Sequence, residues 1–124
     1  APTAIRMLMK AGTDLPEKYD LSHLRHLGSV GEPLNPEAQV WGETVFGGKT
    51  FHDTWWQTET GCIHITNYPF LPIKHGSMGK PIPGVTVGLL DDEFSSELPV
   101  GEQGHLALKT TSPSFFRGYW GRED

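Results

Sequence analysis

Residues 53–61, Asp-Thr-Trp-Trp-Gln-Thr-Glu-Thr-Gly, form the densest cluster of polar and aromatic side chains in the sequence. Their chemistry suits a nucleotide. Indoles can wall an apolar pocket, hydroxyl and amide groups can donate hydrogen bonds to phosphate oxygens, and a carboxylate can hold a hard cation such as Mg²⁺. The same residues are also typical of a strand whose tryptophans are buried and whose polar end is solvated. Composition alone leaves both interpretations open.

A second candidate is the turn at residues 29–33, Ser-Val-Gly-Glu-Pro. Gly31 permits close approach of the backbone to a flat ligand, and Pro33 fixes the direction in which the chain leaves. An ordinary turn between a strand and a helix has the same composition. By itself the turn therefore does not indicate a ligand.

The histidines and the cysteine give little support to a metal centre or a nucleophile. His23 and His26 lie three residues apart, but no second pair of Cys or His follows at zinc spacing. The Gly-x-Ser-x-Gly motif of serine hydrolases is absent. Cys62 has no neighbour in the sequence that marks it as a nucleophile, so we expect it to be a small buried apolar residue. We expect the histidines to be solvated or hydrogen-bonded.

The elements that must position the two candidates are two helices and two strands. A helix is predicted to begin at Pro2, where a proline loses no hydrogen bond, and residues 24–30 are typical of a buried strand. Asn35 is expected to cap a second helix with its side chain, and residues 50–56 form a second strand. The order helix, strand, helix, strand predicts an α/β fold. Both candidates then follow strand ends, where open α/β sheets bind ligands.

The second half of the sequence has a different pattern. Residues 67–83 contain four prolines and are predicted to be a connecting loop. Residues 85–89 alternate apolar and small or polar side chains, and residues 105–109 do so again after a polar turn. We therefore expect antiparallel strands in this half.

Composition and charge exclude several classes of protein. The formal net charge is −5 and no run of Lys or Arg forms a basic stripe, which argues against nucleic-acid binding. No apolar run approaches the roughly 18 residues of a membrane span. A single cysteine favours a reducing, cytoplasmic setting. The sequence opens on a helix start without an initiator Met, so we expect an internal piece of a longer chain.

Several segments, in this order, resemble the adenylate-forming superfamily of acyl-CoA synthetases, luciferases and peptide-synthetase adenylation domains. They cover nearly the whole sequence: APTAIRMLM, LRHLGSVGEPLNPEA, FHDTWWQTETG, GSMGKPIPG, GEQGHLALK and FFRGYW. The string Trp-Trp-Gln-Thr-Glu-Thr-Gly follows Asp-Thr. It is similar to the matching string in the acetyl- and propionyl-CoA synthetase branch of the superfamily. The last two segments occur throughout the superfamily.

The resemblance implies a reaction and its small-molecule partners. Such enzymes activate a carboxylate, here acetate, with ATP and Mg²⁺ to an acyl-adenylate and pyrophosphate, and then transfer the acyl group to coenzyme A. It also implies that residues 1–66 are the C-terminal part of an α/β AMP-binding subdomain, and that residues 67–124 are part of a β-barrel-like subdomain.

The resemblance further implies roles for the residues that match its motifs. Those expected to bind the nucleotide are Gly31, Glu32, Pro33, Asp53, Thr54, Trp55, Trp56, Gln57 and Thr58. Thr58 would donate to a phosphate and Glu59 would help to hold Mg²⁺, which makes these two the catalytic candidates. Val30 and Trp56 would line the acetate pocket. Since successive strand residues face opposite ways, we expect that Trp55 and Trp56 do not both enter one pocket.

Other parts of the superfamily pattern do not occur in this sequence. They are the Ser/Thr/Gly-rich phosphate loop, the ribose-binding Asp, the hinge and the C-terminal domain with its catalytic Lys. We therefore expect that these 124 residues alone show no acetate-dependent ATP–pyrophosphate exchange above a heat-killed control. The alternatives are a module that binds a nucleotide or a partner without turnover, and a purely structural piece.

Overall fold

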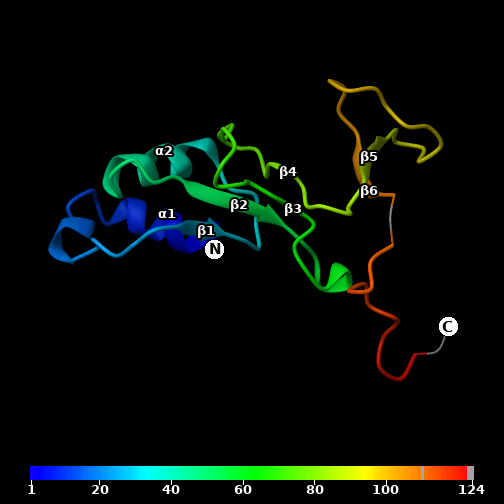
Figure 1. The fold of residues 1–124 in the computed structure, drawn as a ribbon, viewed down its shortest axis with the longest axis horizontal. Coiled ribbons are helices and arrows are strands. Elements are labelled where there is room, and N and C mark those ends of the chain that lie inside the picture. The colour runs from blue at the N-terminus through cyan, green and yellow to red at the C-terminus, as the bar shows by residue number, and fades with distance from the viewer. Residues whose placement is uncertain (110, 123–124) are drawn as a thin grey trace.

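The fold is described by a computed structural model that covers residues 1–109 and 111–122 (Figure 1). The described residues form two α-helices, two single-turn 3₁₀ helices and six strands, and the last four strands follow one another without a helix between them. The helical elements are α1 (Pro2–Lys10), η1 (Pro16–Lys18), α2 (Pro36–Val45) and η2 (Thr58–Thr60). The strands are β1 (Leu27–Ser29), β2 (Phe51–Trp55), β3 (Ile65–Thr66), β4 (Lys80–Pro81), β5 (Val87–Leu90) and β6 (His105–Leu108).

The first half has the predicted order of helix, strand, helix and strand. β1 and β2 are parallel, and their register pairs Leu27 with Phe51 and Ser29 with Asp53. α2 connects them, as a parallel pair requires. α2 begins after Asn35, but the Asn35 side chain makes no capping hydrogen bond, which corrects the expectation. The α/β prediction is confirmed for this part.

Two further strands extend this sheet in a way that the sequence pattern did not predict. β3 pairs antiparallel with β2, and β4 pairs antiparallel with β3, so the strand order is β1-β2-β3-β4. Each has only two residues, too few to show the period of two that identifies a strand. β4 lies within the predicted loop at residues 67–83.

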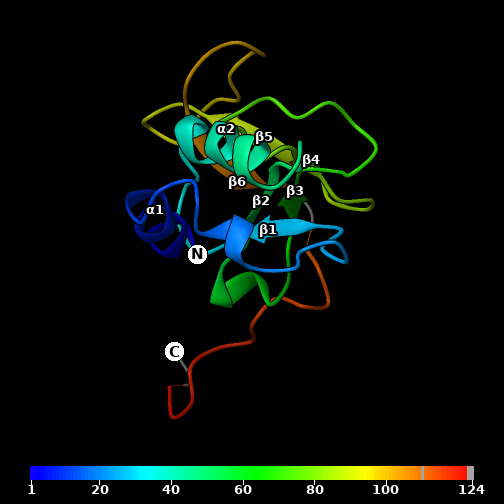
Figure 2. The same ribbon diagram turned by 90° about the vertical axis from the view of Figure 1, so that its left-hand side faces the viewer.

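The core of this part is small. Ile5 of α1, Ala38 of α2, Leu34 and Phe51 of β2 are buried and pack together. α1 packs against α2 and α2 packs against β2, so the two helices lie next to each other on one side of the strands (Figure 2). Leu27, Met9, Trp41 and Phe46 enclose this cluster, and the Trp41 and Phe46 rings meet edge to face at 5.7 Å. This packing holds the ends of β1 and β2 side by side.

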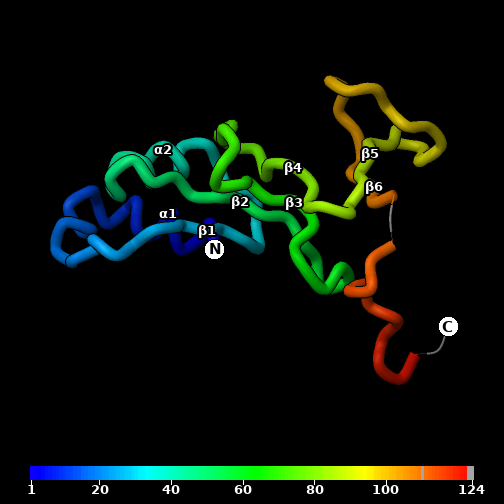
Figure 3. Tube along the Cα trace, in the orientation of Figure 1, coloured from blue at the N-terminus to red at the C-terminus, as the bar shows by residue number. Residues whose placement is uncertain are grey.

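β5 and β6 form a separate two-stranded antiparallel sheet, as expected for the second half. It projects from the end of the main sheet, and the loop between the strands extends farther still (Figures 1 and 3). The described residues form no closed barrel, so the assignment of residues 67–124 to part of a β-barrel-like subdomain stays a prediction. A barrel closes only when many strands complete a ring, whereas here β5 pairs with β6 on one side and is bridged on the other by the loop residue Glu97, opposite Leu90.

The helices in the described ranges are short. The longest, α2, has 10 residues and a length of about 15 Å. None of the described helices has the length and apolar character that crossing a membrane requires.

Candidate functional site

A cavity of about 610 Å³ lies where β1 and β2 end. Eight of the residues expected to bind a nucleotide line it: Gly31, Glu32, Pro33, Asp53, Thr54, Trp55, Trp56 and Gln57. The parallel pairing of β1 and β2 brings the two candidate segments together, because it places the turn after Ser29 next to the residues after Asp53. The site is therefore assembled from stretches about two dozen residues apart in the sequence.

Three of the predicted site residues lie outside the cavity lining. Thr58 and Glu59 are exposed on η2, directly after Gln57. Val30 follows β1 and is 38% exposed. They are neighbours of lining residues in the sequence only: Val30 precedes Gly31, and Thr58 and Glu59 follow Gln57.

The expectation that Trp55 and Trp56 do not enter one pocket is wrong, because both line this cavity. β2 ends at Trp55, so the strict alternation of a strand does not continue to Trp56. Trp56 is also 43% exposed, which excludes the core role of this second indole.

Asp53 holds the turn against the strand. It is 5% exposed, and its carboxylate accepts hydrogen bonds from the backbone N–H groups of Thr54 at 3.0 Å and Leu34 at 3.4 Å. The Thr54 hydroxyl donates to the carbonyl oxygen of Ser29 at 2.8 Å, a second link between the two segments. Burial raises the pKa of Asp53, more than these hydrogen bonds lower it.

The raised pKa of Asp53 predicts a pH dependence. The folded state binds this proton more tightly than the unfolded state, so ionised Asp53 lowers stability at neutral pH and the effect is relieved as the pH falls. We expect the free energy of unfolding of the unmodified chain, minus that of Asp53→Asn, to increase from pH 7 to pH 4. Urea unfolding at each pH measures the difference. A flat difference would contradict this prediction.

Glu32 lines the cavity, and its carboxylate is tied to α1. Its carboxylate accepts hydrogen bonds from the Thr3 hydroxyl at 2.7 Å and from the Arg6 guanidinium at 2.7 Å. These contacts, with the Thr3 hydrogen bond first, lower the pKa of Glu32. Its side chain therefore anchors the turn to α1, while Gly31, with a φ of +100°, presents an open backbone surface.

η2 is fixed from both sides. The buried Thr60 hydroxyl accepts from the Gln57 N–H at 2.9 Å. From the far end of the chain, the Ser114 hydroxyl donates to the Thr60 carbonyl at 2.6 Å and the Phe116 N–H donates to the Glu59 carbonyl at 2.9 Å. The residues around Ser114 thus hold the backbone that carries Glu59, a contact that no local sequence pattern indicates.

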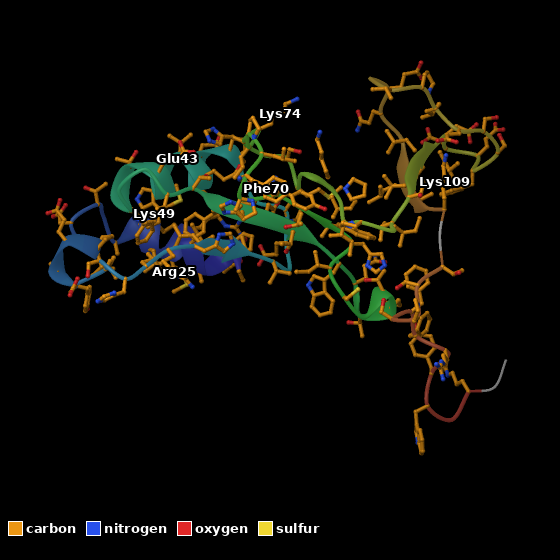
Figure 4. All side chains as sticks on the ribbon, in the orientation of Figure 1. Arg25, Glu43, Lys49, Phe70, Lys74 and Lys109 are labelled. Carbon is orange, nitrogen blue, oxygen red and sulfur yellow. The ribbon has the colours of Figure 1, made fainter. Side chains whose placement is uncertain are left out.

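Five residues of the cavity lining were not predicted: Lys74, His75, Gly76, Ser77 and Met78. They form a continuous segment, here named the 74–78 wall. The Lys74 side chain itself points outward (Figure 4). The only signal for this wall in the sequence was that the segment GSMGKPIPG resembles the superfamily. The resemblance assigned no function to any residue of that segment.

The structure also places the histidines and Cys62. His75 contacts Glu43 at 2.9 Å and His105 contacts Asp92 at 3.2 Å. Within residues 1–109 and 111–122, no three His, Cys, Asp or Glu side chains are grouped to hold a metal ion. Cys62 is exposed, which corrects the expectation of a buried residue.

The sequence of the chain is similar to those of known proteins. The chain matches the AMP-binding enzyme family over residues 1–120, and it belongs to that family. It is 56% identical over 120 residues to the acetyl-coenzyme A synthetase of Bacillus subtilis (strain 168), covering 97% of this chain and 21% of that protein. It is 47% identical over 126 residues to the acetyl-coenzyme A synthetase of Methanothrix soehngenii, covering 100% of this chain and 19% of that protein. The chain thus spans about a fifth of the length of these relatives.

Proposed function

We propose that this chain forms the adenine-nucleotide side of the active site of an AMP-forming acetate–CoA ligase. The full-length protein would convert acetate and ATP to acetyl-adenylate and pyrophosphate, and then transfer the acetyl group to coenzyme A. The observation that carries the proposal is the cavity of about 610 Å³ that gathers eight of the expected nucleotide residues. A cavity of this size is typical of small-molecule sites. The similarity to acetyl-coenzyme A synthetases supports acetate as the acid.

The residues divide into two roles in this proposal. Gly31 and Pro33 offer backbone and ring surface to the adenine, and Trp55 lies on the same cavity. Thr58, whose hydroxyl has no hydrogen bond to another described residue, donates to the α-phosphate. The protein contributes mainly positioning and charge stabilisation, because the reaction asks little covalent chemistry of it.

Mg²⁺ would be held by Glu59. This residue supplies one exposed carboxylate, and it belongs to no group of three or more His, Cys, Asp or Glu side chains in the described part of the chain. One carboxylate fits Mg²⁺, which commonly binds one or two carboxylates together with substrate phosphates and water. The ion would neutralise charge on the phosphates, while Glu59 would hold it in place.

The acyl site and the surroundings are also part of the proposal. Val30 and Trp56 would enclose the acetate, since both lie just beyond the ends of neighbouring parallel strands. The two-stranded sheet of β5 and β6 would be joined by further strands of the full-length protein to complete a barrel-like subdomain. The single cysteine supports a reducing, cytoplasmic location.

Titration with AMP tests the nucleotide role. Trp55 and Trp56 line the cavity and Trp41 and Trp120 do not, so AMP should change the fluorescence of the first pair. The response should disappear in a Trp55→Phe, Trp56→Phe variant and persist in Trp120→Phe. An unmodified chain that shows no response to millimolar AMP would contradict the proposal.

The alternative function is a module that binds a nucleotide or a partner without catalysis. It is favoured if a full-length protein carrying these residues binds AMP and yet shows no acetate-dependent ATP–pyrophosphate exchange. Exchange in the full-length protein, together with its absence in these 124 residues, supports the ligase.

A further inference from the structure

The 74–78 wall is attached to the sheet by a buried glutamine. Gln39 lies on α2 and is 0% exposed. Its Nε2 donates to the carbonyl oxygen of Phe51 at 2.9 Å, and its Oε1 accepts from the N–H of Gly76 at 2.6 Å. One amide group therefore connects the first residue of β2 to the middle of the wall.

A buried asparagine makes a second connection of the same kind. Asn67 is 6% exposed and lies directly after β3. Its Oδ1 accepts from the N–H of Asp53 at 2.8 Å, and its Nδ2 donates to the carbonyl oxygen of Ser77 at 2.9 Å. Both amides thus contact β2 at one end and neighbouring residues of the wall at the other.

The path of this segment is restricted by close packing as well. Gly76 has a φ of +80°, and a Cβ there would lie 2.9 Å from Cγ of Pro36. Gly79 has a φ of +94°, and a Cβ there would overlap the backbone of Thr66. The backbone can pass this close only where a side chain is absent. The wall is therefore ordered by contacts with α2 and β3 before any ligand arrives.

We propose that Gln39 and Asn67 are positioning residues of the cavity, which set its affinity for the nucleotide by holding the 74–78 wall in its binding position. Neither residue lines the cavity, so they act through the wall. A wall without these hydrogen bonds would have to be ordered on binding, and that ordering lowers affinity. The identity of the ligand rests on the proposed function; the attachment of the wall does not.

The test uses Gln39→Met, which keeps the length of the side chain and removes both hydrogen bonds. Gln103→Met is the matched control, because Gln103 is exposed in the loop between β5 and β6. We expect Gln39→Met to bind AMP about 10-fold more weakly by tryptophan fluorescence, and amide hydrogen exchange at Gly76 to accelerate by a similar factor. Its thermal unfolding should stay cooperative, and Gln103→Met should match the unmodified chain in all three measurements.

Asn67→Leu provides an independent variant, in case Gln39→Met does not fold. It should also weaken AMP binding and accelerate exchange at Asp53, whose N–H loses its acceptor. Unchanged AMP affinity in a cooperatively folded Gln39→Met or Asn67→Leu chain overturns the proposal. If the unmodified chain binds no AMP, the proposed function fails. In that case amide hydrogen exchange at Gly76 in Gln39→Met still tests whether Gln39 holds the 74–78 wall. Faster exchange supports this attachment, and an unchanged rate overturns it.

Discussion

Glu59→Gln in the full-length protein is expected to lower the kcat of acetyl-adenylate formation by roughly 100-fold or more, while the Kd for ATP changes little. The charge on the transferring phosphate shifts during the reaction, so a metal ligand that stabilises the shifted charge acts mostly in the transition state. Glu59 is compatible with this proposed role because its carboxylate is exposed and its backbone carbonyl accepts a hydrogen bond from the Phe116 N–H. Acetate-dependent ATP–pyrophosphate exchange at saturating Mg²⁺ measures kcat.

The control for this experiment is Glu102→Gln. Glu102 is an exposed acid in the loop between β5 and β6, so its replacement removes the same charge far from the cavity. It should leave exchange unchanged. Near-normal turnover of Glu59→Gln at saturating Mg²⁺ would show that Glu59 does not hold the metal.

Trp56→Gly in the full-length protein is expected to change the preferred acid from acetate to longer carboxylates. A rigid indole at the acyl site leaves room for only a very short acid. One methylene in an apolar pocket is worth roughly 10- to 200-fold in discrimination, so the ratio of kcat/KM for acetate over butyrate should fall by about 100-fold or more. Kinetics with acids from acetate to octanoate measure this ratio.

Trp55→Gly is the matched comparison. It removes the neighbouring indole of the same cavity and should weaken nucleotide binding or stability without altering the chain-length preference. Trp56 is 43% exposed, so we expect Trp56→Gly to remain folded and to melt cooperatively. A folded Trp56→Gly variant that retains the acetate preference would remove Trp56 from the acyl pocket.

Local patterns in the sequence were sufficient for the first half of the fold. Pro2 and Pro36 begin helices where proline loses no hydrogen bond, and the apolar runs on either side of α2 form the parallel pair. These signals are contained in a few adjacent residues. The two candidate segments also stood out locally, because they lie at strand ends and one of them carries a dense cluster of polar and aromatic side chains, whereas the nucleotide roles of single residues came from the family resemblance and stay a prediction.

Which residues bound the site could be found only from the tertiary structure. The two-residue strands β3 and β4 are too short for a periodic pattern, yet the 74–78 wall lies in the connection between them. The side-by-side placement of Trp55 and Trp56 on one cavity depends on where β2 stops, which pairing with β3 decides.

What the sequence by itself determined is the family, the order of the first helices and strands, and the residues that meet at the ends of β1 and β2. What only the tertiary structure decided is how the cavity is closed. Gln39 contacts Gly76 across 37 positions, and Phe116 contacts the Glu59 backbone from the far end of the chain. A propensity or a spacing reflects neighbours within one or two turns of a helix, whereas these hydrogen bonds form only after packing has brought distant backbone groups together.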